Sequence, residues 1–79
     1  MECMQFRLKG EDSAEVSRMF EGAKLRFIDQ EWFLCRGTEK HKVQSGDWAA
    51  LLKDNKLRVF SHEAFMEFVA NYEEHEDGA

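Results

Sequence analysis

Isolated glycines divide the first 46 residues of this chain into short segments. Glycines 10, 22, 37 and 46 are isolated, and each stands near the end of a run of patterned apolar residues. The chain has no proline and no stretch rich in glycine and serine that would act as a linker. With 79 residues and no internal repeat, it is expected to form one domain over 1–79, burying about 60 % of the surface of the unfolded chain.

The first part of the chain predicts a strand followed by a short helix. Residues 4–8 alternate apolar and polar side chains, which is the period of a half-buried strand. Asp12 and Glu15 then have the spacing of a capping box, in which each side chain bonds the backbone amide of the other. Apolar residues follow at helical spacing, and Gly22 is a stop signal for this helix.

The middle of the chain predicts three consecutive strands. Residues 24–29 and 32–36 read as strands of a hairpin, joined by a tight turn over 29–31. A second turn leads to a short strand at 41–44. An antiparallel meander is therefore expected.

The second half predicts a helix, a strand and a final helix. Ser45-Gly46-Asp47 resembles a helix cap, and the helix after it would carry Trp48 and end near 54–55. Residues 57–60 read as a strand, and Ser61 caps the last helix. The expected order is β-α-β-β-β-α-β-α, a small α+β domain with a mostly antiparallel sheet and helices on one face.

The last helix has an apolar stripe and a row of acids. Phe65, Phe68, Val69 and Tyr72 stand at i, i+3, i+4 and i+7, so they should face the core. Beyond this stripe the helix is expected to fray, leaving 73–79 as an acidic tail.

Ser61 to Ala79 contains six acids and neither Lys nor Arg. Glu63, Glu67 and Glu74 fall on the side opposite the apolar stripe, where neighbours at i,i+4 repel one another by a few tenths of a kcal/mol. Because these acids do not stabilise the helix, they are expected to form a surface for a basic partner. A solvated face that keeps the protein soluble is the alternative. The predicted partner-binding residues are Glu63, Glu67, Glu74, Glu73, Asp77 and, from the first helix, Glu15.

In size, acidity and absence of a catalytic motif, the chain resembles in general character the small inhibitor or adaptor proteins that bacteriophages make against host nucleic-acid machinery, including anti-CRISPR proteins. The resemblance implies a non-enzymatic protein that occupies a basic, nucleic-acid-binding surface of a partner protein. No enzymatic activity, cofactor, metal or membrane partner is expected.

Two other functions remain open. Residues 23–60 hold eight Lys and Arg against five acids, which is a weak charge excess, so direct binding of nucleic acid ranks below the protein partner. Its residues would be Lys24, Arg26, Lys40 and Lys42, on the outer sheet face opposite a core face formed by Leu25 and Phe27; Trp32 and Phe33 are assigned to core and cover. The third possibility is a homodimer that joins the basic face of one copy to the acidic helix of another.

The cysteines and the N-terminus predict a cytoplasmic protein. Cys3 and Cys35 have neither metal-site nor disulfide-framework spacing and are expected to be free thiols in a reducing compartment. Catalysis by Cys35 with His41 is set aside because a strand cysteine is usually a small apolar residue. The N-terminus lacks the features of a signal peptide, and no apolar stretch approaches the roughly 20 residues of a transmembrane helix.

Overall fold

The order of helices and strands confirms the predicted α+β class. The computed structural model describes the backbone of residues 1–77 and the side chains of residues 1–72. The strands are β1 (Glu2–Gln5), β2 (Ala23–Ile28), β3 (Glu31–Arg36), β4 (Glu39–Val43), β5 (Trp48–Leu51) and β6 (Leu57–Phe60). The helices are α1 (Asp12–Met19) and α2 (His62–Asp77).

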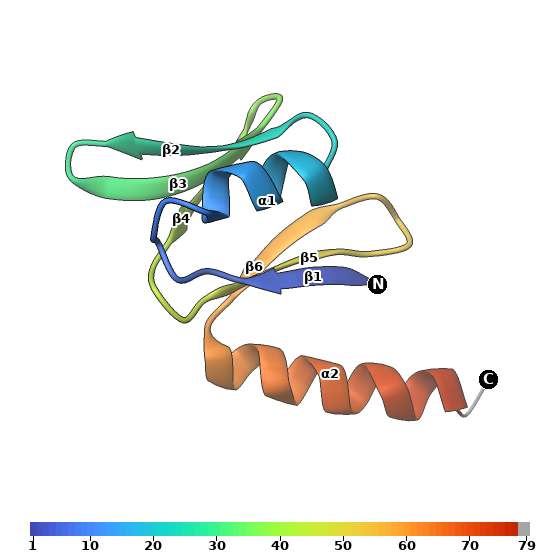
Figure 1. Cartoon of the computed structure of the whole chain (residues 1–79). Coiled ribbons are helices and arrows are strands. Elements are labelled where there is room, and N and C mark those ends of the chain that lie inside the picture. Colours follow the sequence, from blue (N-terminus) through green and yellow to red (C-terminus); the bar gives the residue numbers. More distant parts are fainter. Residues whose placement is uncertain (78–79) are drawn as a thin grey trace.

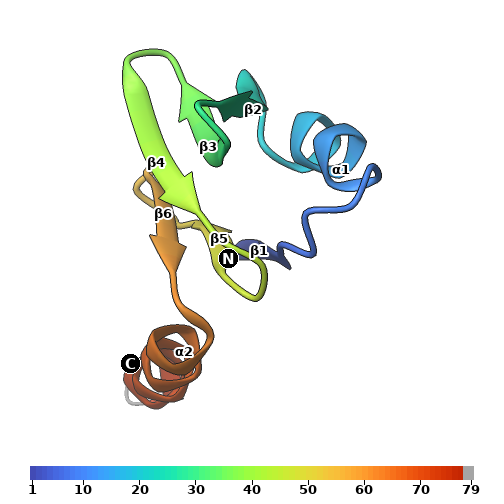
Figure 2. The same ribbon diagram turned by 90° about the vertical axis from the view of Figure 1, so that its left-hand side faces the viewer.

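The strands form two antiparallel sheets, ordered β1–β5–β6 and β2–β3–β4 (Figure 1). The second sheet is the predicted meander, so the strands expected at 24–29, 32–36 and 41–44 are confirmed. The arrangement differs from the predicted single sheet with its helices on one face. Instead, α1 and α2 lie on opposite sides of the β1–β5–β6 sheet (Figure 2).

The core lies between the two sheets and is closed by α1. Its largest fully buried side chains are Phe6, Val16, Phe20 and Leu34. Phe6 follows β1, Val16 and Phe20 come from α1 and its C-terminal end, and Leu34 lies in β3. Burial of each such side chain is worth about 2–3 kcal/mol. One face of each sheet therefore packs on the core, and the opposite face of the β2–β3–β4 sheet is exposed to solvent.

The β2–β3 hairpin extends past this core at its tip. Asp29 and Gln30 have φ angles of 51° and 64°, the backbone of a two-residue type I′ turn that matches the strand twist. Phe27 was expected in the core and lies on the inward face beside half-buried Leu25, but it is 58 % exposed. It is too near the tip to be covered and packs on Trp32, with ring centroids 4.9 Å apart.

The start of α1 differs from the predicted capping box. The helix begins at Asp12 itself, and the N-cap Glu11 makes no side-chain cap bond. Asp12 is buried, and its Oδ2 accepts the N–H groups of Arg7 (2.9 Å) and Leu8 (2.6 Å). The carboxylate therefore binds backbone N–H groups of the loop that precedes α1. Because this loop replaces the end of the predicted strand, β1 ends at Gln5 and does not continue to Leu8.

The predicted helix after Asp47 is wrong, because residues 48–51 form β5, the central strand of its sheet. Gly46 has φ 95° and its N–H donates to the carbonyl of Phe6, while the N–H of Phe6 donates to the carbonyl of Asp47. These bonds fasten the turn to the end of β1. Ala49 and Ala50 point to opposite faces and are both fully buried, so tertiary pairing overrides their helix propensity.

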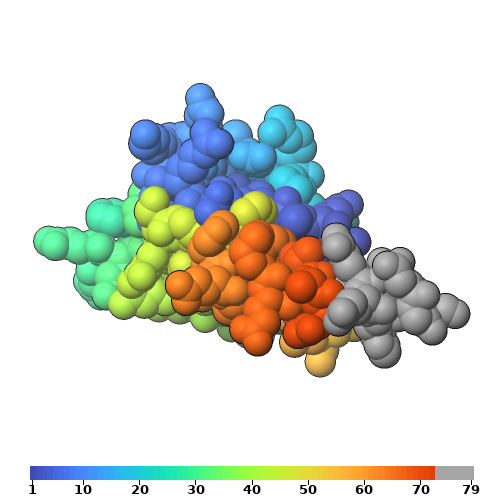
Figure 3. Space-filling model, turned by 90° about the horizontal axis from the view of Figure 1, so that it is seen from below, coloured from blue at the N-terminus to red at the C-terminus, as the bar shows by residue number. Residues whose placement is uncertain are grey.

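Helix α2 packs its apolar stripe on the outer face of the β1–β5–β6 sheet, and the helix covers this side of the molecule (Figure 3). The predicted cap is confirmed, since Ser61 Oγ accepts the N–H of Ala64 at 3.2 Å. Phe65 is buried and stacks on Trp48 at 4.3 Å, and Phe68 stacks on Phe60 at 4.8 Å. The helix continues to Asp77, and the fraying expected over 73–79 stays a prediction.

Candidate nucleic-acid interface

The strand register places the four predicted cations on one face of the β2–β3–β4 sheet. Residues paired across antiparallel strands share a face, so Lys24, Cys35 and Lys40 form one row. Arg26, Phe33 and Lys42 form the next row. We call this surface the basic face, defined by these six residues.

The basic face points away from the core. The alternate residues Leu25 and Leu34 point inward, and Leu34 is fully buried. All four cations are exposed, whereas Phe33 and Cys35 on the central strand are half-buried between them. The predicted positive outer sheet face is therefore present in the fold.

The dimensions of the basic face follow from sheet geometry. Residues two apart on a strand are separated by about 6.8 Å, and strands lie about 4.8 Å apart. The cations of β2 and β4 therefore stand at the corners of a rectangle of roughly 7 by 10 Å at the backbone. Long Lys and Arg side chains can widen this spacing, so several phosphates of one extended chain lie within their reach.

One carboxylate opposes the four cations of the basic face. Glu31 lies on the same face, and its Oε1 is 2.9 Å from Nζ of Lys42. Lys40 instead places its Nζ 4.4 Å from the centroid of the Phe33 ring, a cation–π contact. Among the side chains that the structure describes, Lys24 and Arg26 have no ion-pair partner. Three of the four positive charges are thus not neutralised by an acid.

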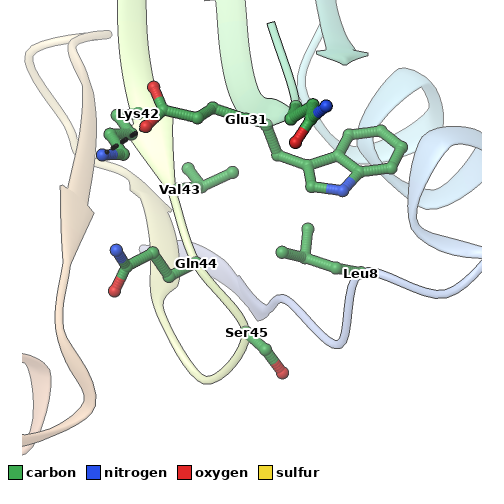
Figure 4. A pocket seen from close by; sticks show the side chains of 8 residues that line it. Leu8, Glu31, Lys42, Val43, Gln44 and Ser45 are labelled. Carbon is green, nitrogen blue, oxygen red and sulfur yellow. Dashed lines mark ion pairs between the residues drawn. The ribbon is translucent and has the colours of Figure 1, made fainter. Parts of the chain in front are cut away.

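Two hollows border this surface. A shallow one lies toward the turn between β3 and β4, and its lining includes Arg26, Cys35 and Lys40. The other lies past the opposite end of the sheet, where Leu8 lies across from the Lys42–Glu31 ion pair (Figure 4) and Trp32 is a further lining residue. Both hollows therefore carry a cation of the basic face at their rim.

The predicted acidic surface is divided by the fold. Glu63 and Glu67 are exposed near the start of α2. Glu15 is half-buried on α1, which lies on the other side of the β1–β5–β6 sheet from α2 (Figure 2). The other predicted residues, Glu73, Glu74 and Asp77, have side chains outside the described part of the chain. Among the three predicted side chains that the structure describes, it brings together Glu63 and Glu67 and separates Glu15 from them.

Sequence reasoning missed the position of Phe33. It treated Phe33 with Trp32 as core and cover, whereas the register puts Trp32 inward and Phe33 at the centre of the basic face. The strict alternation from Trp32 to Arg36 was a usable signal. Once fully buried Leu34 is assigned to the core, Phe33 and Cys35 must point outward.

The Cys35–His41 pair is not assembled. Cys35 is opposite Lys40 in the register and lies on the basic face, while His41 is opposite Leu34 on the inward face. Within the described residues, no group of three or more His, Cys, Asp or Glu side chains is placed to hold a metal ion.

Exposed Asp54, between β5 and β6 and outside the basic face, has a lowered pKa. Its carboxylate accepts the N–H of Lys56 (3.0 Å) and pairs with Arg58 (3.2 Å). The backbone bond from Lys56 is the main cause that holds the pKa of Asp54 below its usual value, and the Arg58 side chain adds to it.

Comparison with known proteins adds no family to this picture. No family model matches the chain, and neither the curated proteins nor the solved structures contain a match. In the part of the chain that the structure describes, no helix is both long enough and apolar enough to cross a membrane.

Proposed function

We propose that the protein is a small nucleic-acid-binding module whose basic face contacts the phosphates of its ligand. The observation that carries the proposal is the strand register, which gathers Lys24, Arg26, Lys40 and Lys42 on one solvent-facing sheet surface. Lysine and arginine side chains bind phosphates by releasing condensed counterions, so the binding constant falls as salt concentration rises.

The size of this effect can be calculated from the cations. For a single strand, the slope of log K against log salt is about −0.7 for each phosphate neutralised, so three to four contacts give roughly −2 to −3. This local effect is compatible with a net charge of −5 for the whole chain, because exposed charges more than about 10 Å apart are largely screened at 0.1 M salt.

The test is binding of a fluorescein-labelled oligodeoxynucleotide, followed by anisotropy between 20 and 300 mM salt. The double variant Lys24→Gln/Lys40→Gln should weaken binding and reduce the slope by about 1.4. The matched control Lys9→Gln/Arg18→Gln removes the same charge from exposed positions before and in α1 and should leave the slope unchanged. Absence of binding at 20 mM salt would remove the proposal.

A second candidate is the protein-binding function that ranked first from the sequence. Glu63 and Glu67 are both exposed one turn apart on α2, away from the buried ring of Phe65. A partner with a basic, nucleic-acid-binding surface, such as the target of a phage-type inhibitor, would pair with them. The partner could also be the basic face of a second copy.

Affinity capture with mass spectrometry tests the second candidate by comparing the wild type with Glu63→Gln/Glu67→Gln. A bound protein lost only in the variant supports it, and identical captured sets contradict it. Sedimentation at 20 and 500 mM salt distinguishes the homodimer, whose mass should fall to that of a monomer at high salt.

A further inference from the structure

We infer that the ligand of the basic face is single-stranded nucleic acid, and that Phe33 is the residue on which one of its bases stacks. This inference rests on the proposed function and specifies its ligand. Phe33 is on the central strand, with Arg26 and Lys42 directly opposite it on the two neighbouring strands. An aromatic ring surrounded by cations can bind a base on its face while the phosphates on either side reach the Lys and Arg side chains.

The contact of Lys40 shows that one face of the Phe33 ring is available. The ammonium group stands 4.4 Å from the ring centroid, on a side chain that is otherwise exposed. An incoming base can take this position over the ring. Lys40 then exchanges its contact with the ring for a stronger one with a phosphate.

The chemistry favours a single strand over a duplex. Bases in a duplex are already stacked and paired, so only an unstacked strand offers a free base surface to the ring. The cation rectangle of roughly 7 by 10 Å also suits a few nucleotides more than the long charged surface of a duplex. Stacking is tolerant of sequence because every base has a π-face.

The neighbouring aromatic residue Phe27 provides an internal comparison. It is 58 % exposed on the same hairpin, but it lies on the inward face and packs on Trp32. No cation of the basic face is opposite it, because its register partner is Trp32. Phe27 is therefore expected to contribute nothing to binding.

The experiment measures affinity for two probes of equal length and charge, a labelled oligothymidine of 15 nucleotides and an abasic oligomer that keeps the phosphates. Phe33→Leu should lower affinity for oligothymidine by about 5- to 150-fold, the loss of one stacked base, and leave abasic affinity within twofold. Phe33→Tyr should retain binding because it keeps the ring. Phe27→Leu should match the wild type with both probes.

The outcomes separate this inference from the proposed function. If both probes bind equally well, and the Lys24→Gln/Lys40→Gln variant weakens both, the basic face binds phosphate but the stacking inference is overturned. Equal losses for the two probes in Phe33→Leu would also overturn it, since the substitution would then act through the sheet. If neither probe binds the wild type, both the inference and the proposed function fail.

Discussion

Removing one acid, Glu31, should strengthen nucleic-acid binding. In the wild type the Glu31 carboxylate, 2.9 Å from Nζ of Lys42, competes with a phosphate for that ammonium group. Lys24, Arg26 and Lys40 are not paired with an acid among the described side chains. The wild type should therefore neutralise about three phosphates, and Glu31→Gln about four. The expected slopes of log K against log salt are about −2.1 for the wild type and −2.8 for the variant.

These slopes fix the expected gain in affinity. One extra phosphate contact with a slope of −0.7 corresponds to roughly eightfold tighter binding at 50 mM salt and threefold at 200 mM. The variant should nevertheless fold normally. The side chains of Glu31 and Lys42 are 47 % and 51 % exposed, and an exposed ion pair contributes at most about 1 kcal/mol to stability.

Anisotropy titrations with the oligothymidine probe at four salt concentrations would measure both quantities. The matched control is Glu63→Gln, which removes the same charge from α2 on the far side of the molecule and should change affinity by less than twofold. Equal gains in the two variants would refute the reasoning, because net charge and not the Lys42 contact would then govern binding. An unchanged slope in Glu31→Gln would refute it as well.

Three further predictions concern stability. Phe65→Ala should cost about 3–5 kcal/mol in urea unfolding, since this ring is 3 % exposed and stacked on Trp48; a loss below 1 kcal/mol would mean that α2 is not docked as described. Gln30→Gly should raise the free energy of unfolding by about 0.5–1 kcal/mol, because its φ of 64° strains any residue with a Cβ, whereas Gln44→Gly should lower it. Asp54 has a lowered pKa in the folded state, so its contribution to stability is present above the unfolded pKa and is lost as pH falls through the folded value. The stability difference between wild type and Asp54→Asn should therefore vanish in acid, and a difference independent of pH would contradict this assignment.

The strands of the meander could be predicted because their patterns are local. The alternation around Leu34 and the two-residue turn at 29–30 define a hairpin without reference to the rest of the chain. The stripe on α2 was equally predictable, because one face of the helix carries its three aromatic side chains and Val69, while Met66 is exposed outside it.

The segment 48–51 could not be assigned from sequence because its environment is decided elsewhere. Two adjacent alanines and a leucine favour a helix in isolation. Partners on both sides, β1 from the N-terminus and β6 after it, make it a central strand that is covered on one face by the core and on the other by α2. Likewise, the Asp12 carboxylate accepts hydrogen bonds from the loop before α1, and this contact between loop and helix could not be predicted from the helix pattern.

The candidate site also has one part that could be predicted from the sequence and another that could not. Strand alternation grouped Lys24 with Arg26 and Lys40 with Lys42, and the register, which makes β3 the neighbour of both strands, joins the two pairs into one face. The position of Phe33 among them depended on which face of β3 the core covers, and the separation of Glu15 from α2 depended on the placement of α1 across the sheet.

The opposite placement of the basic face and α2 gives the molecule an electric dipole moment. The β1–β5–β6 sheet lies between α2 and the β2–β3–β4 sheet (Figure 2), and two stacked sheets are about 10 Å apart, so the positive and negative surfaces are separated by more than about 10 Å. At 0.15 M salt, where the Debye length is about 8 Å, a polyanion at the basic face is shielded from α2; at 0.01 M, where it is about 30 Å, it is not. The dipole should therefore orient an approaching strand toward the β2–β3–β4 sheet, while repulsion by α2 should limit the affinity gained at the lowest salt concentrations.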